Sequence, residues 1–383
     1  MTASGRFHHW LLLDMAFDPA GSRRRAGLAR NALSALLAAA LLMLPATRLR
    51  AAEFQATPQL SANWVQDVYQ PAFRRFANAA DAWTSTTKDL CESGPASRIH
   101  ALQTDFTRLL QDYARVEIFR SGPMLDNHLQ NRLFYWPDKR RVGERQLRSL
   151  LADTDIASLS VRQLARKSVA VQGFPALERL LFSDGHYTVE ETPLCHVVQT
   201  LIQNIASMAD ELDRAWQSDS EYVQAFLHPE PSSPHFRNAN EALRSVITEI
   251  VTGLDSLVDR KLQTLLSGDP RIIRTAPLWR SRRTVAMLTG NVAGIRSLLF
   301  DAGLLQQLAM EDELTTDFDY VDHLLGKLQY TFAFAGPDGQ LSPEVDTVFA
   351  SLSAVLNDIR HTVNHQVLTP LGMGVNFNAD DGD

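Results

Sequence analysis

Apolar residues recur along this chain in steps that alternate between four and three positions. The longest series runs from Leu194 to Leu212, and the same spacing recurs at 102–116, 243–257 and 345–363. Side chains spaced in this way lie on one face of an α-helix, and such a face is buried against other helices in a bundle. The pattern therefore predicts four long amphipathic helices.

β-strands are not expected, because no segment alternates apolar and polar residues in the manner of a half-buried strand. Turn-forming residues separate the helical series at 92–97, 120–125, 267–277 and 335–344. Each half of the chain offers about four substantial helices, which is the content of an antiparallel bundle. The sequence therefore predicts an all-α fold of two antiparallel helical bundles.

The first 52 residues have the pattern of a secretory signal peptide. Arginines at 23–25 precede an apolar run at 32–44, and small residues follow up to Ala51 and Ala52. The run is shorter than the roughly 20 residues that a membrane span needs. We expect cleavage near Ala51 or Ala52, export to the periplasm of a Gram-negative bacterium, and no membrane span in the mature chain. Met15 is an alternative start that gives a signal peptide of more usual length.

The loop at 228–234 is the richest in Pro and Ser, which makes it the best candidate for a boundary between the bundles. The expected organisation is a signal peptide at 1–52, an N-terminal bundle at 53–228 and a C-terminal bundle at 235–383.

The mature chain is expected to be acidic. The full sequence has 37 Lys and Arg against 44 Asp and Glu, a net charge of −7, and its first 52 residues contain seven Arg and two Asp. The mature net charge is therefore about −12. Such a surface disfavours nucleic acid and anionic lipid as partners and is compatible with cations.

Cys91 and Cys195 are the two cysteines of the sequence. An even count in an oxidising compartment favours a disulfide between them. That bond would close a loop of roughly 100 residues and contribute up to about 4–5 kcal/mol in the chain-entropy model. The alternative is a pair of buried free thiols.

The stretch GFPALERLLF, at 173–182, combines helix signals with candidate chemistry. Pro175 suits the first position of a helix, which puts Glu178 in the first turn, where the helix dipole favours an acid. Gly173 would permit a tight turn or a close backbone approach. Three interpretations are open: Glu178 is a structural acid at a helix start, it lines a ligand cleft, or it coordinates a metal directly.

Five segments carry a resemblance that covers nearly the whole mature chain. They are FRSGPM at 119–124, RLFYWPDKR at 132–140, GFPALERLLF at 173–182, PLWRSRRTVAMLTGNVAGIRSLL at 277–299 and NFNADDGD at 376–383. In this order and spacing they resemble the imelysin-like proteins, also called the peptidase M75 family. The resemblance implies a two-domain helical protein of the bacterial envelope, associated with iron uptake. It also implies a cleft between the two bundles around a motif written G-x-H-x-x-E.

Pro175 occupies the histidine position of that motif. The proline nitrogen has no available lone pair, and catalytic zinc normally needs three protein ligands and an open water position. Glu178 is therefore the one candidate metal ligand that the motif retains, and iron or another divalent metal is the only candidate cofactor. We expect a non-enzymatic binding or accessory protein, whose partner would be an iron-uptake or other envelope protein. The alternatives are a zinc metallopeptidase and a structural envelope-interaction protein.

The resemblance assigns six residues to the cleft. They are Gly173, Glu178, Arg120, Asp138, Arg280 and Ser281. Two of them have structural interpretations as well: Asp138 follows a proline and suits the cap of the next turn, and Ser281 suits a helix cap.

His361 and His365 are four residues apart on a predicted helix, a spacing that can hold a metal. Both fall outside the apolar series at 345–363, so we expect an exposed pair.

Overall fold

The structure is a computed structural model that describes residues 57–88, 91, 99–182, 192–331, 341–371 and 373. The regular elements within these residues are helices, with no β-strand among them, which confirms the predicted all-α fold. None of these helices combines the length and the apolar character that a membrane span requires. The predicted signal peptide, the turn at 92–97 and the acidic C-terminus at 376–383 lie outside the described residues.

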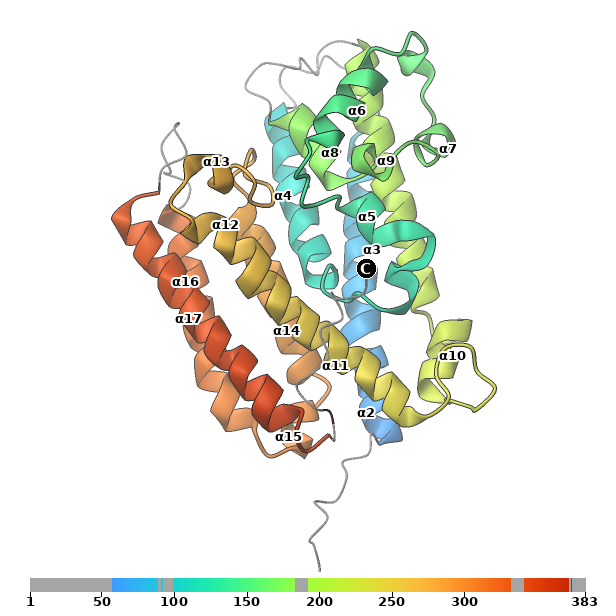
Figure 1. Cartoon of the computed structure of the whole chain (residues 1–383). Coiled ribbons are helices and arrows are strands. Elements are labelled where there is room, and N and C mark those ends of the chain that lie inside the picture. The colour runs from blue at the N-terminus through green and yellow to red at the C-terminus, as the bar shows by residue number, and fades with distance from the viewer. Residues whose placement is uncertain are drawn as a thin grey trace, which may run out of the picture. The chain divides into compact units, whose positions relative to one another are not determined.

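The N-terminal half is built on α3, which packs against both α4 and α9 (Figure 1). Its helices are α2 (Pro58–Asn63), α3 (Gln70–Thr86), α4 (Ile99–Val116), α5 (Leu129–Leu133), α6 (Val142–Leu151), α7 (Val161–Leu164), α8 (Phe174–Leu181), α9 (Thr192–Ala215) and α10 (Glu221–Leu227). The apolar series expected at 102–116 and 194–212 fall in α4 and α9, and their side chains are buried. The three- and four-residue spacing therefore identifies the faces that form this core.

The C-terminal half is a second group of packed helices, in which α14 contacts α11 and α16, and α17 contacts α11 and α16. Its helices are α11 (Ala239–Asp255), α12 (Gln263–Leu266), α13 (Pro270–Ile273), α14 (Thr284–Leu299), α15 (Leu304–Gln307), α16 (Glu311–Thr331) and α17 (Pro343–Thr362). A π-helical stretch at Ser256–Leu262 joins α11 to α12. Ser342 caps α17, because its hydroxyl accepts a hydrogen bond from the N–H of Val345.

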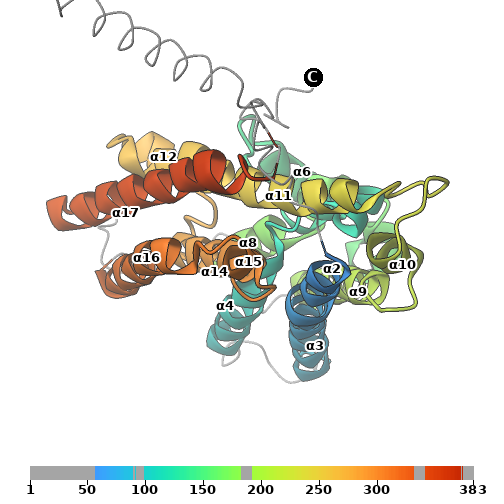
Figure 2. The same cartoon turned by 90° about the horizontal axis from the view of Figure 1, so that it is seen from below.

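The two halves meet along α4 and α14, which pack closely together (Figure 2). Glycines make this approach possible, because a Cβ atom at Gly290 would overlap the side chain of Ala114, and one at Gly294 would overlap the carbonyl oxygen of Arg115. The described residues accordingly group into one compact unit. The loop at 228–234 lies between α10 and α11, and its role as a domain boundary stays a prediction.

The expected disulfide between Cys91 and Cys195 is present, with the two Cα atoms 5.6 Å apart. It links the chain that follows α3 to the first turn of α9, so it fastens together two helices that also pack along their length. The alternative of two free thiols is therefore wrong.

Candidate functional site

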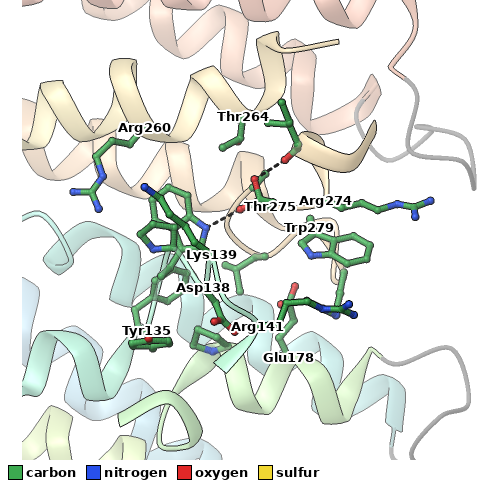
Figure 3. Close-up of a pocket in the computed structure, with 18 of the residues that line it drawn as sticks. Tyr135, Asp138, Lys139, Arg141, Glu178, Arg260, Thr264, Arg274, Thr275 and Trp279 are labelled. Atoms are coloured by element: carbon green, nitrogen blue, oxygen red, sulfur yellow. Dashed lines mark hydrogen bonds between the residues drawn. The ribbon is translucent and has the colours of Figure 1, made fainter. Parts of the chain in front are cut away.

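A cavity of about 1160 Å³ lies between segments from the two halves of the chain. One wall comes from 134–144, which leads into α6, and from Pro175, Glu178 and Arg179 of α8. The opposite wall comes from 259–280, which includes α12 and α13. Figure 3 shows Asp138, Arg141 and Glu178 on the first wall, with Thr264, Thr275 and Trp279 on the second. The motif segment therefore lines a cavity large enough for a small-molecule ligand.

Gly173 is the cap residue that precedes α8 and does not itself line this cavity. A Cβ atom at this position would overlap the backbone carbonyls of Arg132 and Leu133. Glycine is therefore required for the close approach of α8 to the end of α5, and the tight-packing interpretation of Gly173 agrees with this contact.

Glu178 is the fifth residue of α8, so the expectation that it lies in the first turn of a helix is wrong. Its side chain is buried, and its Oε1 accepts hydrogen bonds from the N–H and the hydroxyl of Ser281, at 2.9 and 2.8 Å. Burial raises the pKa of Glu178, although the Ser281 hydrogen bonds and the charges of Arg280 and Arg179 oppose the increase. Glu178 therefore ties α8 to the turn that precedes α14.

Asp138 holds the start of α6 and also reaches α8. Its Oδ1 accepts from the N–H of Val142 at 2.6 Å, and its Oδ2 accepts from the N–H of Gly143 at 3.0 Å and from Arg179 at 3.1 Å. The same arginine donates to the carbonyl of Pro175 at 3.0 Å. Asp138 is thus a helix cap, as its position after Pro137 suggested, and part of an ion pair at the cavity wall.

Arg280 and Ser281 precede α14 rather than begin it, because that helix starts at Thr284. They lie in a turn in which Leu278 and Arg282 have φ values of 58° and 59°. The Arg280 guanidinium stacks over the ring of Trp279, 4.5 Å from its centre. Burial lowers the pKa of Arg280, and the charge of Arg179 lowers it further, while Glu178 opposes the change.

Arg120 does not line the cavity and instead contributes to a buried ion cluster, in which it pairs with Glu117. Lys261 donates to Glu117 at 2.7 Å and to Asn291 at 2.6 Å, and Asn291 donates to Glu117 at 2.9 Å. The cluster joins the end of α4 to the π-helical stretch after α11 and to α14. Through Glu117, Arg120 therefore takes part in the contact between the halves, and it does not line the cavity that Glu178 lines.

A second buried carboxylate, Glu249, is bound by Ser121, the residue that follows Arg120 of the ion cluster. Glu249 of α11 accepts from the N–H and hydroxyl of Ser121, at 2.9 and 2.5 Å, and from the hydroxyl of Tyr69 at 2.6 Å. Burial raises the pKa of Glu249 to about 7, although these hydrogen bonds lower it. The sequence offered no sign of this contact, because its partners are far apart in the chain.

Trp136 is a wall residue that connects the two sides of the cavity. Its indole N–H donates to the carbonyl of Thr275 at 2.9 Å, and the Arg260 guanidinium lies 5.9 Å from its ring centre. Trp136 therefore both lines the cavity and packs against its opposite side.

The side chains at the motif do not provide the ligands of a zinc centre. Pro175 offers no side-chain ligand, Oε1 of Glu178 already accepts two hydrogen bonds, and the nearby charges of Arg179 and Arg280 repel a cation. The described residues contain no group of three or more His, Cys, Asp or Glu arranged to hold a metal ion. His361 and His365 are both exposed, as expected, with ring centres 4.2 Å apart.

Comparison with known proteins identifies relatives through sequence and fold. The sequence pattern of the family described as imelysin, peptidase M75, matches residues 69–359. No functionally curated protein matches the chain. An imelysin-like protein from Psychrobacter arcticum 273-4 has a similar fold, with a TM-score of 0.64 and 19% identity, over 84% of this chain and 98% of that one. A protein from Parabacteroides distasonis ATCC 8503, described as an iron-regulated protein A precursor, matches with a TM-score of 0.61 and 14% identity, over 81% and 96%.

Proposed function

Because this chain belongs to the imelysin family, we propose that it is an exported, non-enzymatic binding protein that takes part in bacterial iron uptake. The observation that carries the proposal is the cavity of about 1160 Å³ at the motif segment. The side chains of that segment do not provide the ligands that a catalytic metal needs. A cavity of this size that combines aromatic walls with fixed polar and charged groups is suited to a small-molecule ligand.

Export and the link to iron rest on separate observations. The pattern of the first 52 residues is typical of a signal peptide, and a disulfide is usual in oxidising compartments. The description of the Parabacteroides relative as iron-regulated supports the association with iron.

The wild-type protein is expected to lack zinc-dependent peptidase activity, because the motif has no imidazole. Pro175→His should restore a His and Glu pair on one face of α8 and raise the affinity for zinc. The substitution should cost at most about 1 kcal/mol of stability, since it mainly relaxes the backbone restriction of proline. Zinc titration by calorimetry and a peptide-cleavage assay measure the two outcomes.

Pro175→Ala is the matched control, because it relaxes the backbone in the same way without adding a ligand. Pro175→His combined with Glu178→Gln should lose the gain in zinc affinity. Zinc-dependent cleavage by the wild-type protein would refute the non-enzymatic assignment. Tight zinc binding by wild type that Glu178→Gln leaves unchanged would place a metal site elsewhere.

Iron limitation should raise the abundance of this protein in the organism that encodes it, because uptake components are needed when iron is scarce. Quantitative immunoblotting of cells grown with and without an iron chelator measures the change, with an unrelated envelope protein as the control. Constant abundance, together with normal growth of a deletion strain on limiting iron, would rule out the iron association while leaving ligand binding in place.

A further inference from the structure

The cavity is rich in positive charge, although the chain as a whole carries a net charge of −7. Seven Lys and Arg residues line it, against four Asp and Glu. A cavity that concentrates one sign of charge between low-dielectric walls attracts ligands of the opposite sign. The local excess of cations is therefore opposite to what the overall composition predicts.

The four acids of the cavity are already engaged in contacts within the protein. Three of its cations are paired as well, Arg141 with Glu144, Arg179 with Asp138, and Arg271 with Asp269 outside the cavity. Asp138 and Glu178 accept the hydrogen bonds described above. Glu144 pairs with Arg141 at 2.9 Å, and Asp259 pairs at 2.5 Å with an arginine of α17 that lies outside the cavity. The main role of these carboxylates is consequently to hold the cavity walls in place, rather than to act as ligands for a bare metal ion.

Two arginine–tryptophan pairs give the cavity a second property. Arg260 lies over Trp136 and Arg280 lies over Trp279, and all four side chains are half-buried wall residues. Aromatic faces and guanidinium planes both favour flat, unsaturated groups, and guanidinium also binds carboxylate and similar oxyanions with two parallel hydrogen bonds. A planar, anionic ligand would match both the aromatic faces and the guanidinium groups.

The electrostatics of Arg280 support an anionic occupant. Burial and the neighbouring charge of Arg179 both lower the pKa of Arg280, so its charged form is partly desolvated and repelled. An anion placed beside the two guanidinium groups would oppose both effects, because its negative charge favours the charged form of arginine.

We propose that this cavity binds a small organic anion with several negative charges and a planar unsaturated part. The inference rests on the ligand-binding function proposed above and names the class of its ligand. It also bears on iron: a cationic cavity repels a bare iron ion, so iron that enters it is carried inside a chelate of net negative charge.

Three fluorescent probes that share one ring system test the sign of the ligand charge. Pyrenetetrasulfonate is a planar anion, pyrenemethanol is neutral, and pyrenemethylamine is a cation at neutral pH. Titration of the purified protein, followed by fluorescence anisotropy, should show that the tetrasulfonate binds at least about tenfold more tightly than the amine. Added salt should weaken that binding, because ions screen exposed charges.

Variants of the wall locate the bound probe. Arg280→Gln and Lys139→Gln should each weaken tetrasulfonate binding, by about tenfold for the half-buried Arg280 and by less for the exposed Lys139. Lys139→Gln keeps the test valid if Arg280→Gln fails to fold, which circular dichroism would reveal. Arg214→Gln is the matched control, because it makes the same change in net charge at an exposed site of α9 outside the cavity and should have no effect.

The possible results separate this inference from the function on which it rests. Selective, salt-sensitive binding that the wall variants weaken supports the anionic ligand. Equal or tighter binding of the neutral or cationic probe, reduced by Trp279→Ala, overturns the anionic ligand but keeps the binding function. Binding of none of the probes, or binding that Arg214→Gln weakens as much as the wall variants do, overturns both.

Discussion

Replacing Glu117 by glutamine should lower the free energy of unfolding by about 3–5 kcal/mol. The carboxylate is almost fully buried and is the shared partner of two cations, Lys261 and Arg120. The Lys261 side chain has no exposed surface, and its ammonium group lies 2.7 Å from the Glu117 carboxylate. Glutamine preserves the shape but leaves a buried ammonium without a counter-charge. Urea denaturation of both proteins measures the difference.

Glu144→Gln is the control for Glu117→Gln, since it makes the same charge change at a more exposed pair with Arg141. Its cost should stay below about 1 kcal/mol. Lys261→Met should cost less than Glu117→Gln, because Arg120 would still pair with the remaining carboxylate. A loss below about 1 kcal/mol for Glu117→Gln would contradict the assigned role of the cluster.

The effect of Glu117→Gln should also depend on pH. Burial alone would raise the pKa of Glu117, but Arg120 and Lys261 lower it from 4.5 to about 2. A carboxyl with a lower pKa in the folded state stabilises the protein above its unfolded pKa, and this contribution disappears as the pH falls. The stability difference between wild type and Glu117→Gln should therefore shrink as the pH falls from 4.5 towards 2.

Replacing both Cys91 and Cys195 by alanine should lower the free energy of unfolding by up to about 4–5 kcal/mol. The two residues are 104 positions apart, so their bond restricts a long loop of the unfolded chain. Denaturation in urea, with and without a reductant, measures the loss. Reduced wild-type protein should match the double variant, because both lack the cross-link.

Thiol titration provides the independent check on the disulfide. Wild-type protein purified without reductant and then unfolded should contain no reactive thiol. Two reactive thiols per chain, or a double variant as stable as oxidised wild type, would show that the cross-link is not formed or does not stabilise the protein.

The long helices could be predicted from the sequence because each depends on a local pattern. The spacing at 243–257 marks the buried face of α11 and its π-helical continuation, and Ser342 followed by Pro343 marks the start of α17. The start of α14 could not be placed in the same way. Arg280 and Ser281 look like a helix start, but the hydrogen bonds from Ser281 to Glu178, over 103 positions, hold these residues in a turn instead.

The candidate site was only partly accessible from the sequence, for a similar reason. Glu178, Asp138 and Arg280 were expected near a ligand cleft, and all three line the cavity. The remaining wall comes from 259–275, which carries no motif and meets the other wall only through tertiary packing. Arg120 was assigned to the cleft by its segment, yet the buried Lys261 and Glu117 place it in another cluster.

The glycine contact between α4 and α14 has a consequence for the kinetics of ligand capture. A hinge motion that opened the cavity would separate α4 from α14 where they touch at Gly290 and Gly294. It would also break the ion cluster that spans the two halves. Encounter with a ligand should therefore be a single step onto an existing surface, without a slow closing phase. Differences in affinity between related ligands should then appear as differences in residence time, with association rates nearly constant.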